Sequence, residues 1–344
     1  MSGTSLDGLD IVFAQFKLNN GIWSHQISHC KTSSYSKSLE NRLRNATQST
    51  ALEISLLNID LAKHFAEEVN AFILENKIPK KDIHCIASHG HTVFHQPDRG
   101  MTLQIGCGQT LASYTNIRVI NNFREKDVVL GGQGAPLVPI GDALLLDNIA
   151  EAYLNLGGFA NISIPKKNML AFDLCPANLA LNTIAKEMGL DFDKDGELGK
   201  SSPIDSVLLK QLNQLEYYAI AAPKSLGTEW LEDNFLSLLA GYNFSQKLGT
   251  VYEHIATIIS SELNHQKVNS VMITGGGAKN SFLIAKIKEK YSGNIILPET
   301  QMIDFKEALI FAFLGVLKLR NEVNCLAAVT GAKRDNVGGN IYLP

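Results

Sequence analysis

Three glycine-rich segments of this chain lie next to strand-like runs of apolar residues, where the backbone must turn sharply. They are Met1–Gly8, the pair Gly157–Gly158 inside Tyr153–Asn161, and Thr274–Asn280. Without a Cβ, glycine allows successive backbone N–H groups to point at an anion. One such turn is most often a plain hairpin. Three of them, two on similar hairpins about one domain apart, predict a cleft that binds a nucleotide from both sides.

The segments between these turns alternate between strand and helix periodicity. Ile11 and Phe13, and later Ile162 and Ile164, alternate as the return strands of two hairpins should. We expect further strands over 82–88, 101–105, 117–120, 170–173, 270–273 and 294–297, and helices over 51–76, from Pro176, over 250–263, after Asn280 and over 305–319. Strands that alternate with helices predict an α/β fold with sheets covered on both faces.

The length and composition fit two domains of ordinary size. The chain has 344 residues, of which 45% are hydrophobic and 19% charged. We place the halves at residues 1–145 and 146–344, and the last helix and tail could return toward the first half. The near-balanced charge of 31 basic and 34 acidic residues, without a basic run, argues against a nucleic-acid partner.

The chain also gives expectations about its surroundings. No basic-then-apolar leader is visible at the N-terminus, and the apolar runs are too short to cross a bilayer. Five cysteines, far apart and odd in number, are typical of reduced thiols in a cytoplasmic protein. The pairs His25/His29 and His91/His95 lie in strand or loop patterns, so a zinc enzyme is disfavoured.

Many short blocks, in one order along nearly the whole chain, carry a resemblance to a known family. The chain resembles the anhydro-N-acetylmuramic acid kinases of the sugar kinase, Hsp70 and actin superfamily. The blocks are Met1–Gly8, Ser88–Val93, Thr102–Gly106, Gly131–Pro139, Leu156–Ser163, Phe172–Asp173 with Pro176 and Asn178, Gly275–Asn280, Lys306–Ala308 and Val329–Ala332.

The resemblance implies a duplicated ribonuclease H-like fold with a nucleotide cleft between its domains. It implies that ATP and Mg²⁺ serve a reaction in which water opens the 1,6-anhydro bridge and O6 is phosphorylated. The products would be N-acetylmuramate 6-phosphate and ADP, as in peptidoglycan recycling. The partner would be a small sugar, with no nucleic acid and no membrane, and a homodimer is left open.

The same resemblance implies residue roles at the nucleotide. The first phosphate loop would be Gly3, Thr4, Ser5, Leu6, Asp7, Gly8, Leu9 and Asp10, in which Asp7 would orient a magnesium-bound water. Read as a turn alone, Asp7 would be an Asx residue that stabilises Asp-Gly. The other domain would contact phosphate through Gly157 and Gly158, and adenosine through Gly275, Gly276, Gly277 and Asn280.

At the sugar, Asp173 would be the catalytic base. We expect Asp173 to end a strand just before a helix that Pro176 starts, so that the helix N-terminus keeps the carboxylate ionised. Without the resemblance, such an Asp would be a helix cap. Glu307, expected at the start of an apolar helix, would lie by the sugar and water, or else complement the helix dipole. Arg124 would contact the lactyl carboxylate together with His89, with a surface ion pair as the alternative for Arg124.

Departures from the family pattern leave other functions open. The family's Asp-Thr-Gly-Pro-Gly-Asn stands here as Asp173-Leu-Cys-Pro-Ala-Asn178, which changes Leu174, Cys175 and Ala177; Asn182 and Asn122 replace Asp. The chain also starts at the first phosphate turn, without the strand expected before it. The alternatives are a kinase for a different sugar and a nucleotide-gated sugar sensor with little or no catalysis.

Overall fold

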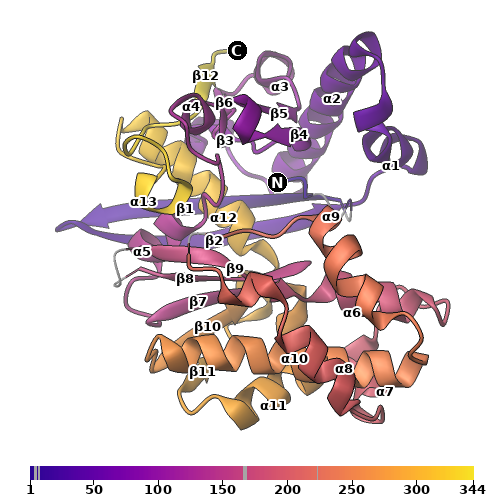
Figure 1. Ribbon diagram of the computed structural model, residues 1–344. Helices are drawn as coiled ribbons and strands as arrows, with labels where there is room; N and C mark the ends of the chain where they lie inside the picture. The colour runs from indigo at the N-terminus through magenta and orange to yellow at the C-terminus, as the bar shows by residue number, and fades with distance from the viewer. Residues whose placement is uncertain (4–5, 7, 166–168, 223) are drawn as a thin grey trace. The chain divides into compact units, whose positions relative to one another are not determined.

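The computed structural model describes residues 1–344 except 4–5, 7, 166–168 and 223 (Figure 1). The chain forms two compact units. Unit 1 comprises Met1–Leu145 and Phe305–Pro344, and unit 2 comprises Leu146–Asp304. The C-terminal segment therefore groups with the first 145 residues, and not with the segment that precedes it. Both units combine sheets with helices, as the predicted α/β class requires.

The described residues of unit 1 form three small sheets. The first is an antiparallel hairpin of β1 and β2, the second has the order β12-β6-β3, and the third pairs β4 with β5. The strands are β1 (Leu9–Asn19), β2 (Ile22–Ser33), β3 (Ile86–Ala87), β4 (His91–Gln96), β5 (Met101–Ile105), β6 (Val119–Asn121) and β12 (Asn340–Tyr342). The helices are α1 (Lys37–Arg44), α2 (Ala51–Glu75), α3 (Gly108–Thr115), α4 (Glu125–Val129), α5 (Pro139–Leu145), α12 (Thr300–Leu319, from Phe305 on) and α13 (Ala327–Thr330).

Helix α2 confirms the periodicity read from the sequence to within one residue. It begins with a capping box. The Thr50 side chain accepts a hydrogen bond from the backbone N–H of Glu53, and the Glu53 side chain accepts one from the backbone N–H of Thr50. Its buried face, with Leu61 and Phe65, packs into a cluster that includes Ile105 of β5 and Leu111 of α3. This cluster holds the elements that carry the N-terminal turn.

Unit 2 is built on one five-stranded sheet of order β11-β10-β7-β8-β9. β11, β10 and β7 are parallel neighbours, whereas β8 is antiparallel to both β7 and β9. The strands are β7 (Ala152–Leu156), β8 (Phe159–Ile164), β9 (Leu170–Pro176), β10 (Ser270–Thr274) and β11 (Asn294–Ile296). The helices are α6 (Asn178–Lys186), α7 (Glu197–Lys200), α8 (Ser206–Asn213), α9 (Thr228–Trp230), α10 (Phe244–His265) and α11 (Ser281–Lys290).

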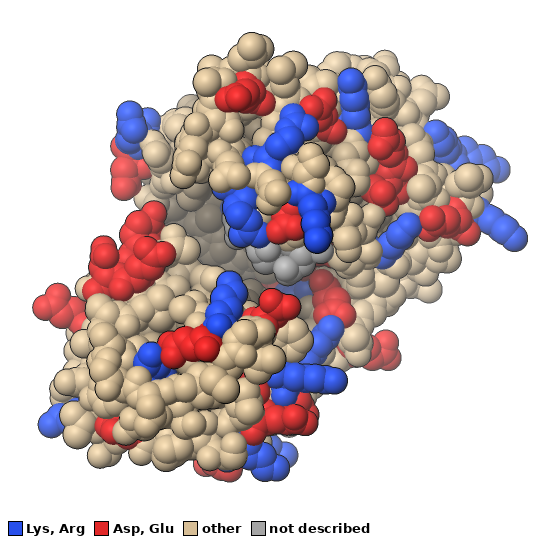
Figure 2. Space-filling model, turned by 90° about the vertical axis from the view of Figure 1, so that its right-hand side faces the viewer, with Lys and Arg blue, Asp and Glu red and all other residues tan. Residues whose placement is uncertain are grey.

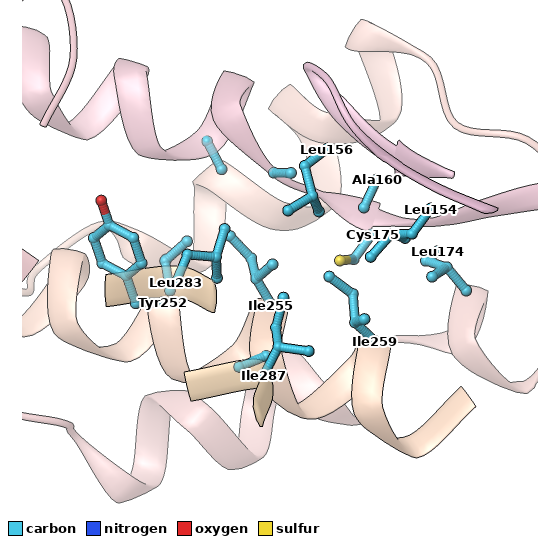
Figure 3. Packing of buried hydrophobic residues seen from close by; sticks show 14 of the residues in the cluster. Leu154, Leu156, Ala160, Leu174, Cys175, Tyr252, Ile255, Ile259, Leu283 and Ile287 are labelled. Carbon is cyan, nitrogen blue, oxygen red and sulfur yellow. The ribbon is translucent and has the colours of Figure 1, made fainter. Parts of the chain in front are cut away.

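The core of unit 2 lies between this sheet and helix α10. In Figure 3 the sheet residues Leu154, Leu174 and Cys175 face Ile255 and Ile259 of α10. All five are at most 2% exposed. Burial of one such aliphatic side chain stabilises the fold by roughly 1.5–3 kcal/mol. Packing against α10 therefore fixes the position of the sheet's inner face.

The outer surface carries charges of both signs. Lys and Arg side chains are mixed with Asp and Glu on the face that Figure 2 shows. Across the described residues, no helix is long and apolar enough to cross a membrane. The five cysteines are free thiols.

The buried carboxylate of Asp127 binds the C-terminal segment of unit 1 to the rest of that unit through hydrogen bonds. Its Oδ1 accepts hydrogen bonds from Cys325 Sγ (3.0 Å), Thr330 Oγ1 (2.8 Å) and Asn336 Nδ2 (3.0 Å). Its Oδ2 accepts one from the backbone N–H of Gly134 at 2.8 Å. A fully buried carboxylate is stable only when its oxygens are satisfied in this way.

Replacement of Asp127 should therefore destabilise unit 1. We expect Asp127→Ala to lower the free energy of unfolding by about 3 kcal/mol, because several buried donors lose their acceptor. Urea unfolding followed by circular dichroism measures this. Glu125→Ala, at an exposed position two residues earlier, is the control and should change stability by less than about 0.5 kcal/mol. Equal effects of the two substitutions would contradict this account.

Candidate functional site

Two of the predicted glycine turns lie side by side in unit 2. β7 and β10 are parallel neighbours in register, with Thr274 opposite Asn155, so both strands deliver their turns to the same sheet edge. Gly275 has φ +82°, and a Cβ there would lie 2.5 Å from Asn155 Oδ1. Only glycine fits this close approach. The carboxyl ends of parallel strands are where α/β proteins bind ligands.

The Gly157–Gly158 turn is held by the start of helix α6. The carbonyl of Gly158 accepts from the N–H groups of Ala177 (2.9 Å) and Leu179 (3.1 Å), and that of Gly157 from Asn178 (3.1 Å). The Asn178 side chain also donates to the Leu156 carbonyl at 2.9 Å. These hydrogen bonds fix the shape of the turn, and they use the backbone N–H groups at the start of α6.

Asn280 has a local structural role. Its Oδ1 accepts from the N–H of Leu283 at 3.0 Å and caps α11, while its Nδ2 donates to Tyr252 Oη at 2.8 Å. The predicted contact of Asn280 with adenosine remains a prediction. Gly276 and Gly277 lie in the short 3₁₀ turn before it.

Asp173 lies in the middle of β9, which corrects the expectation that it ends the strand. β9 continues for three residues to Pro176, and α6 begins only at Asn178. The helix N-terminus is therefore not the group that sets the ionisation of Asp173. Burial raises the pKa of the Asp173 carboxyl above its ordinary value, against the lowering effect of a hydrogen bond from the Leu226 N–H.

The segment around Lys224–Gly227 holds Asp173, a role that could not be read from the sequence. The Leu226 N–H donates to Asp173 Oδ2 at 2.9 Å, and the Lys224 carbonyl accepts from the Asp173 N–H at 3.2 Å. Tyr217 Oη donates to the Asp173 carbonyl at 2.6 Å. Asp173 is thus fixed by three contacts from outside its own sheet.

A row of polar residues crosses the sheet of unit 2 to Asp173. Thr274, Asn155, Asn161 and Asp173 are successive register partners on β10, β7, β8 and β9. Partners in register point to the same face of a sheet. Thr274 is 1% exposed, and its Oγ1 has no hydrogen-bond partner among the described residues. The row joins the glycine turns to the predicted base, and single-sequence motifs did not reveal it.

The N-terminal turn of unit 1 is described only in part, since Thr4, Ser5 and Asp7 lie outside the described residues. Gly8 has φ +146°, and a Cβ there would lie 2.5 Å from the carbonyl oxygen of Ser33 on β2. Leu6 and Leu9 belong to the buried cluster under α2. Gly3 accepts a backbone hydrogen bond from Leu6 at 3.3 Å, and Asp10 Oδ1 accepts from Thr32 Oγ1 at 2.6 Å.

His89 and Arg124 form a coupled pair in unit 1. Arg124 Nε donates to His89 Nε2 at 3.0 Å, and Arg124 Nη1 donates to the Gly134 carbonyl at 2.8 Å. His89 Nδ1 lies 3.0 Å from the Gly90 carbonyl, so the neutral tautomer protonated at Nδ1 satisfies both contacts. Burial, together with the Arg124 charge, holds the pKa of His89 well below its ordinary value. His89 therefore positions Arg124.

Glu307 lies in the interior of α12, which corrects the expectation that it starts this helix. The helix begins at Thr300, two turns earlier, so Glu307 does not complement the helix dipole at its first turn. The Glu307 side chain is exposed to solvent, yet the protein atoms around it desolvate the carboxyl and raise its pKa, and the Arg124 charge opposes that rise. A carboxyl near a guanidinium in unit 1 is consistent with a polar substrate site.

His91 fixes the beginning of the N-terminal turn. Ser2 Oγ lies 3.2 Å from His91 Nδ1 and accepts a hydrogen bond from Tyr35 Oη at 2.7 Å. All three residues are buried. In the described part of the chain, no group of three or more His, Cys, Asp or Glu side chains gathers as a metal site.

Two glycine turns at the carboxyl ends of adjacent parallel strands, with a half-buried carboxylate at the end of the polar row, form a candidate ligand site. A family model described as anhydro-N-acetylmuramic acid kinase matches residues 1–344. The chain belongs to the anhydro-N-acetylmuramic acid kinase family, as its motifs predicted, and it is a phosphotransferase of that family. The predicted α/β class is confirmed by the sheets and helices of both units.

The chain matches curated relatives over nearly their whole length. The chain is 30% identical to the anhydro-N-acetylmuramic acid kinase of Sulfurovum sp. over 100% of this chain and 98% of the relative. It is 33% identical to that of Haemophilus influenzae, over 97% of this chain and 94% of the relative. Among solved structures, the activator of 2-hydroxyisocaproyl-CoA dehydratase from Clostridium difficile with bound ADPNP has a TM-score of 0.44 at 14% identity, over 90% of this chain and 97% of that one.

Proposed function

We propose that this chain uses ATP to convert 1,6-anhydro-N-acetylmuramic acid into N-acetylmuramate 6-phosphate and ADP. Water opens the anhydro bridge, and the released O6 accepts the γ-phosphoryl group. Membership of the family over all 344 residues is the observation that carries this function. The reaction belongs to the recycling of peptidoglycan fragments.

For the nucleotide, we assign the glycine turns of unit 2 and the N-terminal turn of unit 1. Gly157–Gly158 and Gly275–Gly277 come from adjacent parallel strands, and this placement supports phosphate contact by both. Asp10 offers the hard carboxylate oxygen that Mg²⁺ prefers, and Asp7 is the residue proposed to orient its water. Bound Mg²⁺ would neutralise charge on the phosphates.

For the sugar, we assign Asp173 as the base that takes a proton from the attacking water. Its raised pKa brings it closer to the operating pH, which favours proton transfer. The contacts from Leu226 and Tyr217 hold it in place without consuming Oδ1. Arg124, positioned by His89, would bind the lactyl carboxylate, and Glu307 would lie near the sugar and water.

Asp173→Asn should remove the base while preserving the shape of the site. We expect turnover to fall roughly 10²–10⁴-fold, with ATP still bound and the melting temperature little changed. In the parent enzyme, kcat/KM should fall toward acid pH as Asp173 becomes protonated, with a midpoint above the ordinary Asp value because its pKa is raised. The residual activity of the variant should lack that dependence.

Asp191→Asn, an exposed position in the same unit, is the control and should leave turnover unchanged. Near-parental turnover of Asp173→Asn would make another carboxylate, foremost Glu307, the base.

Arg124→Lys tests the assignment of the sugar carboxylate. Lysine cannot form the forked contact and loses the hydrogen bonds that position Arg124, so KM for the sugar should rise roughly 10–100-fold. KM for ATP should stay within about twofold of the parent. Arg118→Lys, an exposed position nearby in sequence, is the control. A rise confined to the ATP KM would refute the assignment.

The origin of the product oxygens separates this reaction from that of an ordinary sugar kinase. In H₂¹⁸O, one ¹⁸O atom should enter the product at C1, because water attacks the anomeric carbon. The oxygen on C6 should stay unlabelled, because it is the former bridging oxygen. The product must be trapped before the open sugar exchanges its anomeric oxygen with solvent, and mass spectrometry then locates the label. Label absent from C1 would exclude the anhydro-sugar mechanism. ATP turnover that does not respond to the sugar would instead favour a sensor.

A further inference from the structure

The ammonium group of Lys224 lies against two aromatic rings close to Asp173. Its Nζ is 4.6 Å from the centre of the Tyr217 ring and 5.7 Å from that of Phe172, the residue before Asp173 on β9. Nζ also donates to the Tyr217 carbonyl at 3.1 Å. Burial lowers the pKa of this ammonium, and the charge of Glu262 on α10 opposes that lowering. Two ring faces and a backbone acceptor together hold a cation in one place.

These contacts close a circuit of hydrogen bonds around Asp173. The Tyr217 hydroxyl donates to the Asp173 carbonyl at 2.6 Å, and the Asp173 N–H donates to the Lys224 carbonyl at 3.2 Å. The ammonium then binds Lys224 back to Tyr217. Two residues later, the Leu226 N–H donates to Asp173 Oδ2 at 2.9 Å. The position of the Leu226 N–H therefore depends on how Lys224 is held.

Residues 224–227 have little regular structure to fix them. They lie outside the helices and strands and immediately precede α9, and Ser225 and Gly227 are exposed. A segment without the hydrogen bonds of a helix or a strand ladder is positioned by its remaining contacts. The side chain of Lys224 supplies several of these contacts at once.

The ammonium influences the carboxyl of Asp173 through this segment. The pKa of Asp173 is raised by burial and lowered by the Leu226 N–H. The neighbouring titratable side chains are Tyr217 and Cys175, and burial raises the pKa of both, so they are neutral near neutral pH. The Leu226 N–H is thus the polar group through which Lys224 acts on the carboxylate.

We propose that Lys224 is a positioning residue for the base, because its ammonium holds the Leu226 N–H against Asp173 Oδ2. Oδ1 is then left to accept the proton of the attacking water. This inference rests on the proposed function, in which Asp173 is the base. A fixed donor on one oxygen gives the other oxygen a single orientation toward the water.

Direct binding of the sugar by the ammonium is the alternative, and the two roles change different quantities. A sugar ligand sets KM for the sugar and acts only when substrate is present. A positioning residue sets the ionisation of Asp173 even in the substrate-free chain. The experiment therefore begins without substrate.

The test uses the full chain with substitutions at Lys224. Lys224→Met keeps the length of the side chain and removes its charge and its donor. Lys224→Arg retains both and can stack on the same rings. Lys224→Gln has a neutral polar end, which suits this partly exposed position if Lys224→Met folds poorly. Lys210→Met, at an exposed position of α8, is the matched control.

The first readout is the titration of the Asp173 carboxyl without substrate, followed by ¹³C NMR of chains labelled at the Asp carboxyl carbon. Asp173→Asn identifies the signal. The Leu226 hydrogen bond favours the charged form, so its loss in Lys224→Met and Lys224→Gln should raise the pKa of Asp173 above that of the parent. Lys224→Arg and Lys210→Met should titrate as the parent does.

The second readout is the pH profile of kcat/KM for the anhydro sugar. A raised pKa leaves less of the base ionised at acid pH, so Lys224→Met should lose roughly tenfold in kcat/KM below the parent's midpoint. At alkaline pH, where Asp173 is ionised in both chains, the two should agree within about threefold. KM for the sugar should stay within about threefold of the parent, and Lys224→Arg should restore the profile.

An unchanged Asp173 titration in both Lys224→Met and Lys224→Gln would overturn the proposal, whatever their melting temperatures. A rise of the sugar KM with the titration unchanged would also overturn it and would make Lys224 a sugar ligand. A parent chain without sugar-dependent turnover would instead refute the proposed function. The substrate-free titration would in that case still decide whether Lys224 holds the donor to Asp173.

Discussion

The parallel register of β7 and β10 is the constraint on which the candidate site of unit 2 depends. With Thr274 opposite Asn155, Gly275 lies against the carbonyl of Leu156, where a Cβ would approach to 2.9 Å. A slip of one residue would send every side chain of β10 to the other face. The apolar core of unit 2 resists that slip, because it contains Val271 and Ile273 of β10, which the slip would turn away from it. Packing in the core thus fixes the geometry of the turns.

Two buried hydrogen-bond networks of unit 1 are centred on Asp127 and on Arg124. Asp127 binds four donors, and His89 accepts from Arg124 while its other nitrogen contacts a backbone carbonyl. Buried polar networks of this kind are stable when each member is paired. Arg124 is consequently held at both Nε and Nη1, and a pre-positioned guanidinium loses less side-chain entropy when a carboxylate binds.

Periodicity and turn chemistry predicted the regular elements well. The hairpin of β7 and β8, helix α2 and the capped start of α11 lie where the pattern placed them. The predicted ends of strands were wrong where pairing with a distant strand decides them. Pro176 looked like a helix start, but β9 is an edge strand, where proline is tolerated, so the strand continues through it. Residues 82–85 were expected in a strand, but no strand among the described residues pairs with them, and only Ile86–Ala87 pair with β6.

The sequence predicted which residues belong to the candidate site. It did not predict the hydrogen bonds and strand pairings that hold them in place. Motifs identified Asp173, Arg124 and the glycine turns, yet the contacts that hold Asp173 come from Tyr217 and Leu226, which lie 44 and 53 positions later. Contacts between segments so far apart leave no local period in a single sequence. Likewise, the row from Thr274 to Asp173 arises from strand order, which neither turn chemistry nor composition specifies.

The departures from the family pattern can be judged by where these side chains lie. Leu174, Cys175 and Ala177 are at most 2% exposed and belong to the core behind the sheet, not to the polar row. Asn122 has φ +56°, a conformation that asparagine adopts more readily than most residues. The hydrogen bonds that hold Asp173 come from Tyr217, Lys224 and Leu226, all outside the altered block. The altered positions therefore lie in the packing behind the strand, apart from the residues whose hydrogen bonds orient the carboxylate.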